Sequence, residues 1–519
     1  MSPRVVLALD VGTQSARALL FDAAGALLGK AQQFYEPVYR APQPGWAEQD
    51  ADGYWQALQD CCAALWRDAA VRADAVAAVT LTTQRASVVC TDAAGRPLRP
   101  AMLWLDQRRA RHPPGMGPLW NTAFRLAGAK TLINQVQCEA EANWLAENEP
   151  ALWGETAHFV LLSGWLSWKL CGDWVDSVGA QVGYLPFDYK RQAWAGPRDF
   201  KWRALAVRRE QLPRLVPPAQ RLGTLTPAAS EALGLPGGLP LIAAAADKAC
   251  EVLGSGAVTP DIAQLSFGTT ATINTVQPRY VEVQRLVPAY PAAQPGAWNT
   301  EIQIYRGFWM VSWFRREFAQ AEERLAAERG IAVESLFDEL VRSVPPGAMG
   351  LTLQPYWSPG VREPGPEAKG AIIGFGDVHT RAHLYRAILE GLIYGLRGGC
   401  EQIERKLGRP IRLLRVSGGG SQSDQALQIT ADIFNRPAER PAIYETSGLG
   451  AAINAAVGLG WHVDHDAAVR AMTRVGQRFE PDPEVARTYD ALYREVYSRM
   501  YGRLRPLYRA IRRITGYPP

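Results

Sequence analysis

Two short turns rich in glycine and hydroxyl groups are the first residues of this chain that could do chemistry. They comprise Asp10, Gly12, Thr13, Gln14 and Ser15 in the first turn, and Gly268, Thr269 and Thr270 in the second. A tight turn can point its backbone N–H groups outward beside such hydroxyls, which makes a nest for phosphate oxygens. Each sequence taken singly is more often only a turn. Asp10 favours the functional interpretation, because a carboxylate there can hold the hydrated Mg²⁺ that accompanies a polyphosphate.

Asp247 is the most suggestive single residue. It follows the apolar run 241–246, which predicts a buried strand, and the carboxyl ends of such strands are where α/β folds place ligands and reactive groups. The same residue could be the N-cap of the helix predicted to begin at Lys248. The residues alone leave both interpretations open.

Standard nucleotide and metal motifs are absent from the sequence. Lys30 follows a glycine but precedes Ala31 rather than Ser or Thr, so there is no P-loop. The dinucleotide fingerprint fails at Ile453, where a third glycine is needed. His379 and His383 have helical spacing but no third ligand, which favours positions on the surface of a helix over a metal site.

The elements that must position these residues are short strands. Residues 5–9 and 16–21 flank the first turn, and residues 262–275 repeat the order strand, turn, strand about half a chain later. Two halves that begin alike predict two related α/β domains facing one another.

Later segments continue the α/β pattern and suggest a domain boundary. They are a helix at 381–395, a strand at 413–416, three glycines at 418–420 and a helix at 422–435. A stretch rich in Pro and Gly, 213–240, precedes the predicted strand that ends at Asp247. We place the boundary just after that strand, which gives a first domain of residues 1–254 and a second of residues 255–485.

The C-terminal residues 486–519 differ in composition from the rest. The formal net charge is +5, and residues 487–513 hold eight Arg and no Lys against only two acidic residues. Tyr489, Tyr493, Tyr497 and Tyr501 recur every four residues, which puts one aromatic stripe along a helix. We expect this basic helix to dock its tyrosines on the body; a nucleic-acid-binding arm is the alternative.

The overall composition is typical of a globular protein. Of 519 residues, 47% are hydrophobic and 21% charged, which excludes a disordered chain or a small disulfide scaffold. Seven cysteines occur without a CxxC pair, and no apolar run reaches the roughly 18 residues of a membrane span. We therefore expect a cytoplasmic protein with no membrane or nucleic-acid partner, and a homodimer is left open.

Six motifs, in order, resemble those of the FGGY carbohydrate kinases. They read DVGTQS with Arg17 at 10–17, PGWAEQD at 44–50, GRPLRP at 95–100 leading to WLD at 104–106, ADK at 246–248, SFGTT at 266–270 and GGGSQS at 418–423. Each alone is weak, but six in order across almost the whole chain are specific. A Gly- and Ala-rich segment, 448–461, also resembles the family's closing motif.

The resemblance implies a two-domain α/β ATPase fold of the actin, Hsp70 and hexokinase type, with a cleft between the domains. It implies that the first domain binds a sugar, the second binds ATP, and Asp247 accepts the proton of the attacking hydroxyl. Asp10 and Asp247 would face Mg²⁺. The cofactor-binding residues that it implies are Asp10, Gly12, Thr13, Gln14, Ser15, Arg17, Gly268, Thr269, Thr270, Gly419, Gly420, Ser423 and Asp424.

The expected sugar site departs from that of the better-known members. Its residues would be Gln84, Arg85, Trp104, Asp247 and Lys248. Gln84-Arg85-Ala86 aligns with Gln-Arg-Glu in glycerol kinases and Gln-Met-His in xylulose kinases, and Ala86 cannot accept a hydrogen bond from a hydroxyl. Val136 stands where the glycerol enzymes carry a tyrosine, and Lys248 replaces the usual Gln. We expect a roomier site that disfavours glycerol and takes a larger sugar, ketose or polyol. Residues 298–309 could line it or pack beneath the second domain.

Two other functions could use the same fold. A nucleotide-dependent switch of the chaperone or actin type would bind phosphates with the same turns and phosphorylate nothing, and an inactive sensor would have lost its catalytic groups. The sugar-side motifs around Trp46, Trp104 and Asp247 count against the switch. The presence of both Asp10 and Asp247 counts against the sensor.

Overall fold

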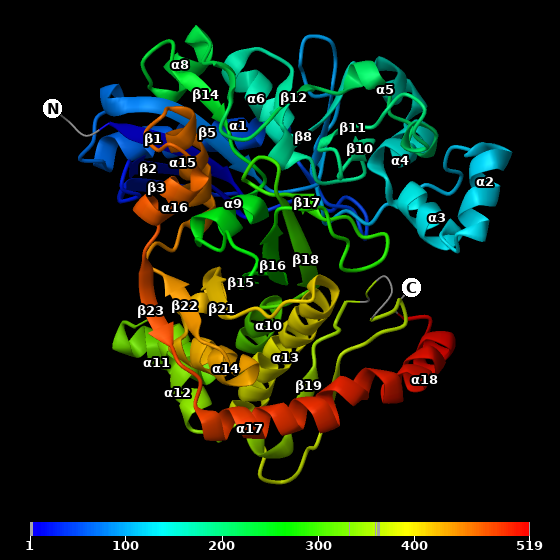
Figure 1. The fold of residues 1–519 in the computed structure, drawn as a ribbon, viewed down its shortest axis with the longest axis vertical. Coiled ribbons are helices and arrows are strands. Elements are labelled where there is room, and N and C mark those ends of the chain that lie inside the picture. The colour runs from blue at the N-terminus through cyan, green and yellow to red at the C-terminus, as the bar shows by residue number, and fades with distance from the viewer. Residues whose placement is uncertain (1–3, 332, 359, 361–363, 518–519) are drawn as a thin grey trace.

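Two large sheets, one above the other in Figure 1, form the centres of two α/β domains. The structure is a computed structural model that describes residues 4–331, 333–358, 360 and 364–517. Within that part of the chain, no helix combines the length and the apolar character needed to cross a membrane.

The first sheet has the strand order β13-β14-β5-β1-β2-β3. Its strands are β1 (Val5–Val11), β2 (Ser15–Asp22), β3 (Leu27–Phe34), β5 (Val76–Thr83), β13 (Arg221–Thr224) and β14 (Pro240–Ala243). The strands β1, β2 and β3 form an antiparallel meander, and β5 and β14 then continue the sheet in parallel to β1. The strand predicted at 241–246 is shorter than expected. It ends at Ala243, and its last three predicted residues leave the sheet before α9 begins.

The second sheet repeats this arrangement. Its strands are β15 (Ile262–Phe267), β16 (Ala271–Gln277), β17 (Tyr290–Pro291), β18 (Trp298–Ile304), β21 (Leu413–Ser417), β22 (Ala438–Pro441) and β23 (Val475–Phe479), in the order β17-β18-β16-β15-β21-β22-β23. Again an antiparallel meander, β15-β16-β18, is followed by two parallel strands, β21 and β22. The shared topology confirms the prediction of two related halves.

Helices cover both faces of each sheet. In β1, Val5, Leu7 and Leu9 pack toward α1 (Ala51–Asp68), whereas Val6 and Ala8 pack toward α9 (Asp247–Gly254) and α15 (Thr446–Gly458). Alternate residues of a strand point to opposite faces, so a strand buried on both sides is apolar throughout. On the second sheet the corresponding helices are α13 (Arg381–Leu407) and α14 (Asp424–Phe434). Helix α13 is longer than the predicted helix at 381–395.

The remaining elements build outward from these layers. The helices are α2 (Gly117–Leu126), α3 (Lys130–Glu139), α4 (Glu141–Asn148), α5 (Pro150–Glu155), α6 (Leu162–Cys171), α7 (Lys201–Ala204), α8 (Pro227–Leu233), α10 (Trp309–Phe318), α11 (Gln320–Arg329), α12 (Val333–Arg342) and α16 (His465–Met472). The strands are β4 (Glu48–Gln49), β6 (Val88–Thr91), β7 (Ala101–Met102), β8 (His158–Leu161), β9 (Val175–Ser177), β10 (Phe187–Asp188), β11 (Ala193–Trp194), β12 (Arg214–Val216), β19 (Thr352–Gln354) and β20 (Ala371–Ile373).

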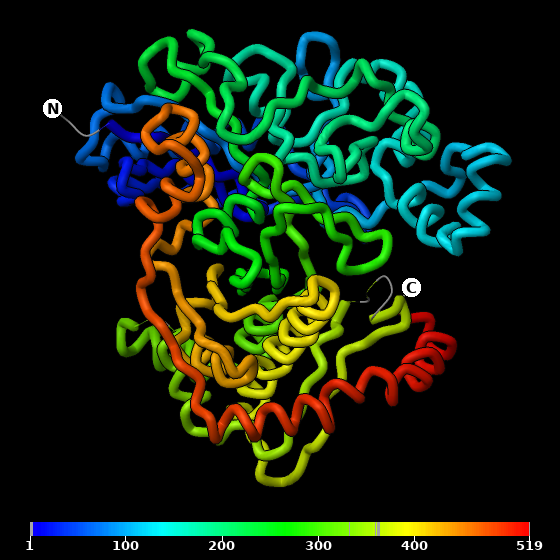
Figure 2. Tube along the Cα trace, in the orientation of Figure 1, coloured from blue at the N-terminus to red at the C-terminus, as the bar shows by residue number. Residues whose placement is uncertain are grey.

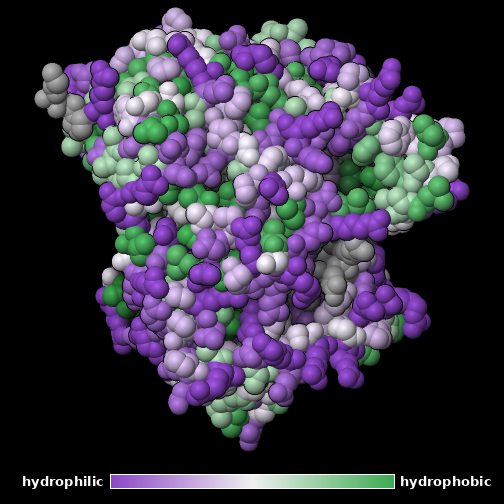
Figure 3. All heavy atoms as spheres, viewed as in Figure 1, coloured by the Kyte–Doolittle hydropathy of each residue, from purple (hydrophilic) through white to green (hydrophobic). Residues whose placement is uncertain are grey.

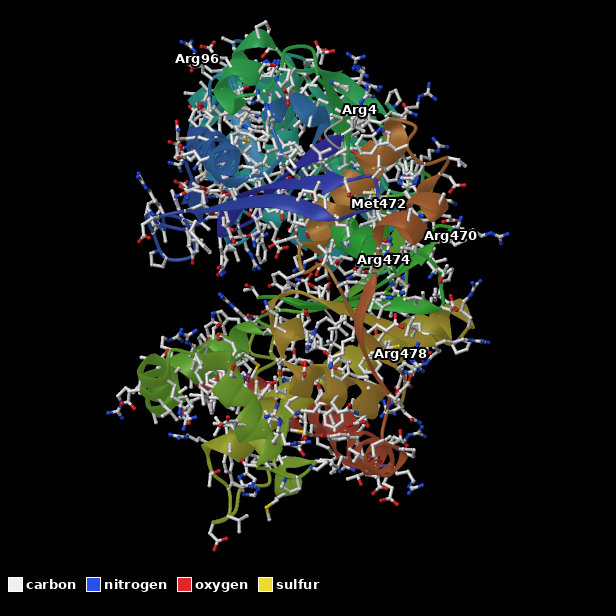
Figure 4. The ribbon with its side chains drawn as sticks, turned by 90° about the vertical axis from the view of Figure 1, so that its left-hand side faces the viewer. Arg4, Arg96, Arg470, Met472, Arg474 and Arg478 are labelled. Atoms are coloured by element: carbon white, nitrogen blue, oxygen red, sulfur yellow. The ribbon has the colours of Figure 1, made fainter. Side chains whose placement is uncertain are left out.

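The chain crosses between the domains late in the sequence. The tube in Figure 2 runs from the second sheet up to α15 and α16 and then returns to β23. Figure 4 shows the return, with Met472 on the first domain and Arg478 on the strand that descends to the second. Residues 446–472 thus lie on the first sheet, although they fall inside the sequence range 255–485.

The C-terminal tyrosines are buried against the second domain. Tyr489, Tyr493 and Tyr497 belong to its core, and they lie on α17 (Pro483–Leu492) and on a π-helical turn, Tyr493–Tyr497, that leads into α18 (Ser498–Thr515). A spacing of four residues exceeds the 3.6 residues of an α-helical turn, so a straight helix would rotate the stripe away from the body. The wider π-helical turn counters that rotation.

Two glycines let α9 and α15 pack backbone to backbone. A Cβ on Gly450 would lie 1.9 Å from the Cys250 carbonyl oxygen, and one on Gly254 would lie 2.0 Å from that of Thr446. Since neither carbonyl belongs to a flexible side chain, neither can move aside. The position of α9, and of Asp247 at its start, therefore depends on these two glycines.

Replacing Gly450 with Ala should push the two helices apart. We expect Gly450→Ala to lower the free energy of unfolding by about 2–3 kcal/mol, the usual cost of overpacking a tight core. Denaturation in urea, followed by tryptophan fluorescence, measures the change. Gly502→Ala in α18 is the matched control, because nothing lies within 4 Å of its added Cβ. The close-packing argument fails if the two variants are equally stable.

Candidate active site

The candidate active site is centred on the start of α9, between the two sheets. Asp247 is the first residue of this helix rather than its N-cap, and its Oδ1 accepts a hydrogen bond from the Lys248 backbone N–H at 2.7 Å. Desolvation raises the pKa of the half-buried Asp247 carboxyl, while Lys248 and Arg85 oppose the rise. A carboxylate in such a setting can accept a proton.

The first turn places a second carboxylate near Asp247. The Gly12 N–H donates to the Ser15 carbonyl at 3.0 Å and closes the turn between β1 and β2. Burial raises the pKa of Asp10 to about 6; Arg17, whose Nη1 donates to Asp10 Oδ2 at 3.0 Å, lowers it, and Asp247 raises it further. Asp10 and Asp247 are therefore close enough for their charges to act on one another.

Arg17 is held behind this carboxylate. Besides its bond to Asp10, its Nε lies 3.6 Å from Glu445 Oε2, just before α15. Gln14 is exposed at the tip of the turn, and its carbonyl accepts from the Tyr35 N–H at 3.0 Å. Of these two expected nucleotide contacts, only Gln14 has an exposed side chain.

A chain of hydrogen bonds joins the first turn to the expected sugar side. Trp104 Nε1 donates to Thr13 Oγ1 at 2.9 Å, and Thr13 Oγ1 donates to Gln84 Oε1 at 3.0 Å. Gln84 is buried and its Nε2 donates to the Tyr54 hydroxyl at 3.0 Å. The side chains of Thr13, Gln84 and Trp104 are hydrogen-bonded to one another. The donors that the turn can offer to a ligand are therefore backbone N–H groups.

The second turn follows β15 and packs beneath the glycine segment 418–420. The Gly268 carbonyl accepts from the Phe308 N–H at 3.1 Å, and Thr269 is exposed. A Cβ on Gly420 would lie 2.4 Å from Phe308 Cδ1, so the segment can lie this close only as glycine. The turn and the glycines thus form one surface.

A pocket of about 310 Å³ opens beside these glycines. Ser417 and Ser421 line it from the end of β21, and Tyr444 and Thr446 line it from the approach to α15. Ser423 caps α14 by accepting from the Ala426 N–H at 3.0 Å. Asp424 Oδ1 accepts from Arg440 Nη2 at 2.7 Å, so Asp424 is committed to an ion pair beside the pocket.

On the sugar side, Arg85 crosses to the second domain. Its Nη1 and Nη2 donate to the two carboxylate oxygens of Glu301 on β18, both at 3.0 Å, and it lies 5.4 Å from the centre of the Tyr290 ring. Ala86, the next residue, has φ of 52°, in the left-handed region. Figure 3 shows the molecular outline indented between the two domains on the right, below α2 and α3.

Residues that sequence reasoning missed complete this side. The Tyr184 hydroxyl donates to Glu139 Oε2 at 2.6 Å, and Tyr290 faces Arg85. No motif marks Glu139, Tyr184 or Tyr290, and only the folded chain brings them together. Glu301 lies inside the stretch 298–309, which was predicted either to line the site or to pack beneath the second domain. Its contact with Arg85 places this part of the stretch against the first domain.

Comparisons with known proteins agree with this geometry. A model of the N-terminal domain of the FGGY family of carbohydrate kinases matches residues 5–254, and its C-terminal counterpart matches residues 263–459. The chain belongs to the FGGY family of carbohydrate kinases. The family assignment confirms the resemblance drawn from the six motifs.

Individual relatives cover nearly the whole FGGY chain. It is 27% identical to the uncharacterized sugar kinase YgcE of Escherichia coli (strain K12), over 96% of this chain and 93% of that protein. It is 31% identical to a glycerol kinase of Dechloromonas aromatica, over 92% and 94%. The crystal structure of a xylulose kinase from Rhodospirillum rubrum superposes with a TM-score of 0.79 at 26% identity, covering 98% and 100%. The two-domain fold of the actin and hexokinase type is thereby confirmed.

Glu141, at the start of α4, is a buried acid with an unpartnered atom. Its Oε2 has no hydrogen-bond partner in the described part of the chain. Desolvation raises the pKa of this carboxyl from 4.5 to about 8, with Asp106 and Glu139 adding to the rise. The folded protein therefore holds a proton at Glu141 across neutral pH.

This proton makes stability depend on pH. Between pH 4.5 and about 8 the folded state holds the proton that the unfolded state has lost, so the contribution of Glu141 to stability falls as pH rises. Glu141→Gln should remove that loss and gain up to about 3.5 kcal/mol more over wild type at pH 8 than at pH 5. Urea denaturation at the two pH values measures it, with the exposed Glu155→Gln as control. Equal gains at both pH values would contradict the assignment.

Proposed function

We propose that this FGGY kinase transfers the terminal phosphate of ATP to a hydroxyl group of a sugar, ketose or polyol. The observation that carries the proposal is the place of Asp247, half-buried at the start of α9. Asp10 of the first turn and Arg85 of the sugar side are both close enough to it for their charges and its own to act on one another.

Asp247 is the general base of the proposed reaction. The substrate hydroxyl gives its proton to the Asp247 carboxylate as its oxygen bonds to phosphorus. The bond from that phosphorus to ADP breaks, and ADP leaves with the electron pair. Such a reaction asks the protein mainly to align the hydroxyl and to balance charge, which suits a site built from one base and two backbone turns.

The two carboxylates suit a hydrated Mg²⁺. Mg²⁺ usually takes one or two protein carboxylates and completes its shell with water and phosphate oxygens. Asp10 and Asp247 offer that number, and the described residues include no group of three acidic, His or Cys side chains that could hold a metal alone. When bound, the ion neutralises phosphate charge. Its water-mediated contact through Asp10 remains part of the proposal.

The phosphates would lie between the two turns. Each turn follows the first strand of its meander, β1 or β15, so the two occupy equivalent places in the two sheets. Backbone N–H groups at 13–14 and 268–270 are the proposed donors, with the hydroxyls of Thr269 and Thr270 beside them. Gly419 and Gly420 would lie against the adenosine, next to the pocket at Ser417 and Tyr444.

We propose a substrate larger than glycerol. Arg85 gives both terminal nitrogens to Glu301, and Ala86 has no side-chain acceptor, so this corner offers few hydrogen bonds to a three-carbon polyol. Trp104, fixed through Thr13, would form an apolar wall. Related chains carry the names glycerol kinase and xylulose kinase. The substrates to test should therefore range in size from glycerol to a sugar such as xylulose.

The free cysteines support a reducing compartment. All seven are unpaired thiols in the structure, as expected for a protein that works in the cytoplasm. We propose that location for the enzyme.

A panel of sugars and polyols tests the reaction. With Mg-ATP, we expect one compound to raise the rate of ADP release at least tenfold. Such a rise is expected because a bound substrate hydroxyl is aligned with the phosphate and deprotonated by the base. Asp247→Asn should lower kcat by about 10²–10⁴-fold, since it removes the base. Coupled ADP release is the measurement.

Asp482→Asn is the matched control, because Asp482 also stands at the start of a helix, where it caps α17 far from the site. It should keep full activity. The kinase proposal would be contradicted if no sugar changed the rate of ATP hydrolysis, or if the Asp247→Asn variant kept wild-type turnover. If glycerol were the best substrate, the argument from Ala86 and Arg85 would be wrong.

A further inference from the structure

One charged side chain beside the proposed base has no part in the reaction described above. Lys248 Nζ donates to Glu251 Oε2 at 2.8 Å and to Ser266 Oγ at 2.6 Å. A Cβ placed on Gly268 would lie 3.9 Å from that nitrogen, so the ammonium lies next to the second phosphate turn. Lys248 thus reaches from the helix that carries the base to the turn proposed to hold phosphate.

The ammonium is held firmly and is still accessible. Glu251, which is buried, accepts from Lys248 and Ser266 through Oε2 and from Ser417 Oγ through Oε1, at 2.7 Å for the last. An ammonium has three N–H groups, and only two of those on Lys248 have partners among the described residues. Its side chain is 22% exposed, so a ligand can reach the third.

Other cations near the turns, in the part of the chain that the structure describes, are each paired with a carboxylate. Arg17 pairs with Asp10 and Glu445, and Lys30 also pairs with Glu445. Arg85 gives both terminal nitrogens to Glu301. Lys248 is the cation whose charged nitrogen lies beside Gly268 of the second turn.

Lys248 also keeps its charge in this setting. The nitrogen of its ammonium lies 2.8 Å from Glu251 Oε2, and a carboxylate at that distance favours the charged form. A cation beside the base is useful in phosphoryl transfer, because negative charge spreads over the oxygens of the moving group.

We propose that Lys248 binds the terminal phosphate of the nucleotide, the group that is transferred, and that Glu251 is the positioning residue that holds it there. The proposal rests on the proposed kinase function and names a further residue for it. Lys248 donates a hydrogen bond and keeps its protons throughout, while the proton of the substrate goes to Asp247.

The test compares two nucleotides that differ in the terminal phosphate. Isothermal titration with β,γ-imido-ATP and with ADP, both with Mg²⁺, needs no sugar substrate. We expect Lys248→Gln to weaken binding of β,γ-imido-ATP by about 10- to 100-fold, the effect of losing a charge-assisted hydrogen bond. ADP binding should change less than about threefold, because ADP lacks the phosphate that Lys248 contacts.

Three further variants separate phosphate binding from a purely structural ion pair. Lys248→Arg keeps the charge and should keep most of the preference for β,γ-imido-ATP. Glu251→Gln should weaken β,γ-imido-ATP several-fold more than ADP. Lys169→Gln is the matched control, because Lys169 is 26% exposed and pairs with Asp52 at 3.1 Å, in an ion pair between α6 and α1; it should bind both nucleotides as wild type does. Thermal melting checks that each variant is folded.

The outcomes distinguish this inference from the proposed function. Wild-type protein that binds neither nucleotide overturns both. Suppose instead that the wild-type protein binds both nucleotides and that Lys248→Gln weakens the two affinities equally or leaves both unchanged. That result overturns only the role of Lys248, and the kinase proposal is then decided by the sugar panel. If Lys248→Gln fails to fold, Lys248→Arg and Glu251→Gln still decide, because equal effects on both nucleotides in those variants overturn the inference.

Discussion

The buried carboxylate of Glu251 is the contact on which the arrangement of the site depends. It lies one helical turn after Asp247 on α9, and its two oxygens bind Ser266 at the end of β15 and Ser417 at the end of β21. One side chain from the helix of the first domain therefore fixes two strand ends of the second. A buried carboxylate without such partners would be costly, so the three elements hold their places together.

The same principle governs the rest of the cleft. Arg85 of the first domain is met by Glu301 of the second, and Arg17 and Lys30 are met by Glu445, where the chain enters α15. Each pair is at least partly buried, so breaking it would leave a desolvated charge. Closure of the two domains is thus specified by matched charges, and the backbone N–H groups of the turns stay available for a ligand.

Much of this could be read from the sequence, for physical reasons that vary by residue. The two turns, Asp10 and Asp247 are local patterns, because a Gly-Thr turn between strands, or a carboxylate after an apolar run, is defined by a few consecutive residues. Glu251 and Glu301 could not be recognised, since their partners are distant in sequence. The strand at 241–246 was predicted too long, because β14 ends at Ala243, and Ala244 and Ala245 pack in the cluster that contains α15. Lys248 was predicted as a sugar-site residue and as a departure from the family pattern, and its neighbours became known with the fold.

The return of α15 and α16 to the first sheet bears on how the protein is made. One face of β1 and β2 is covered by residues that follow position 446, so a chain that has left the ribosome only as far as residue 254 still exposes Val6, Ala8, Leu19 and Phe21. The first domain cannot reach its final packing during synthesis of its own sequence. It must wait for most of the second domain to be translated, and a chaperone that shields apolar sheet surface would act in that interval.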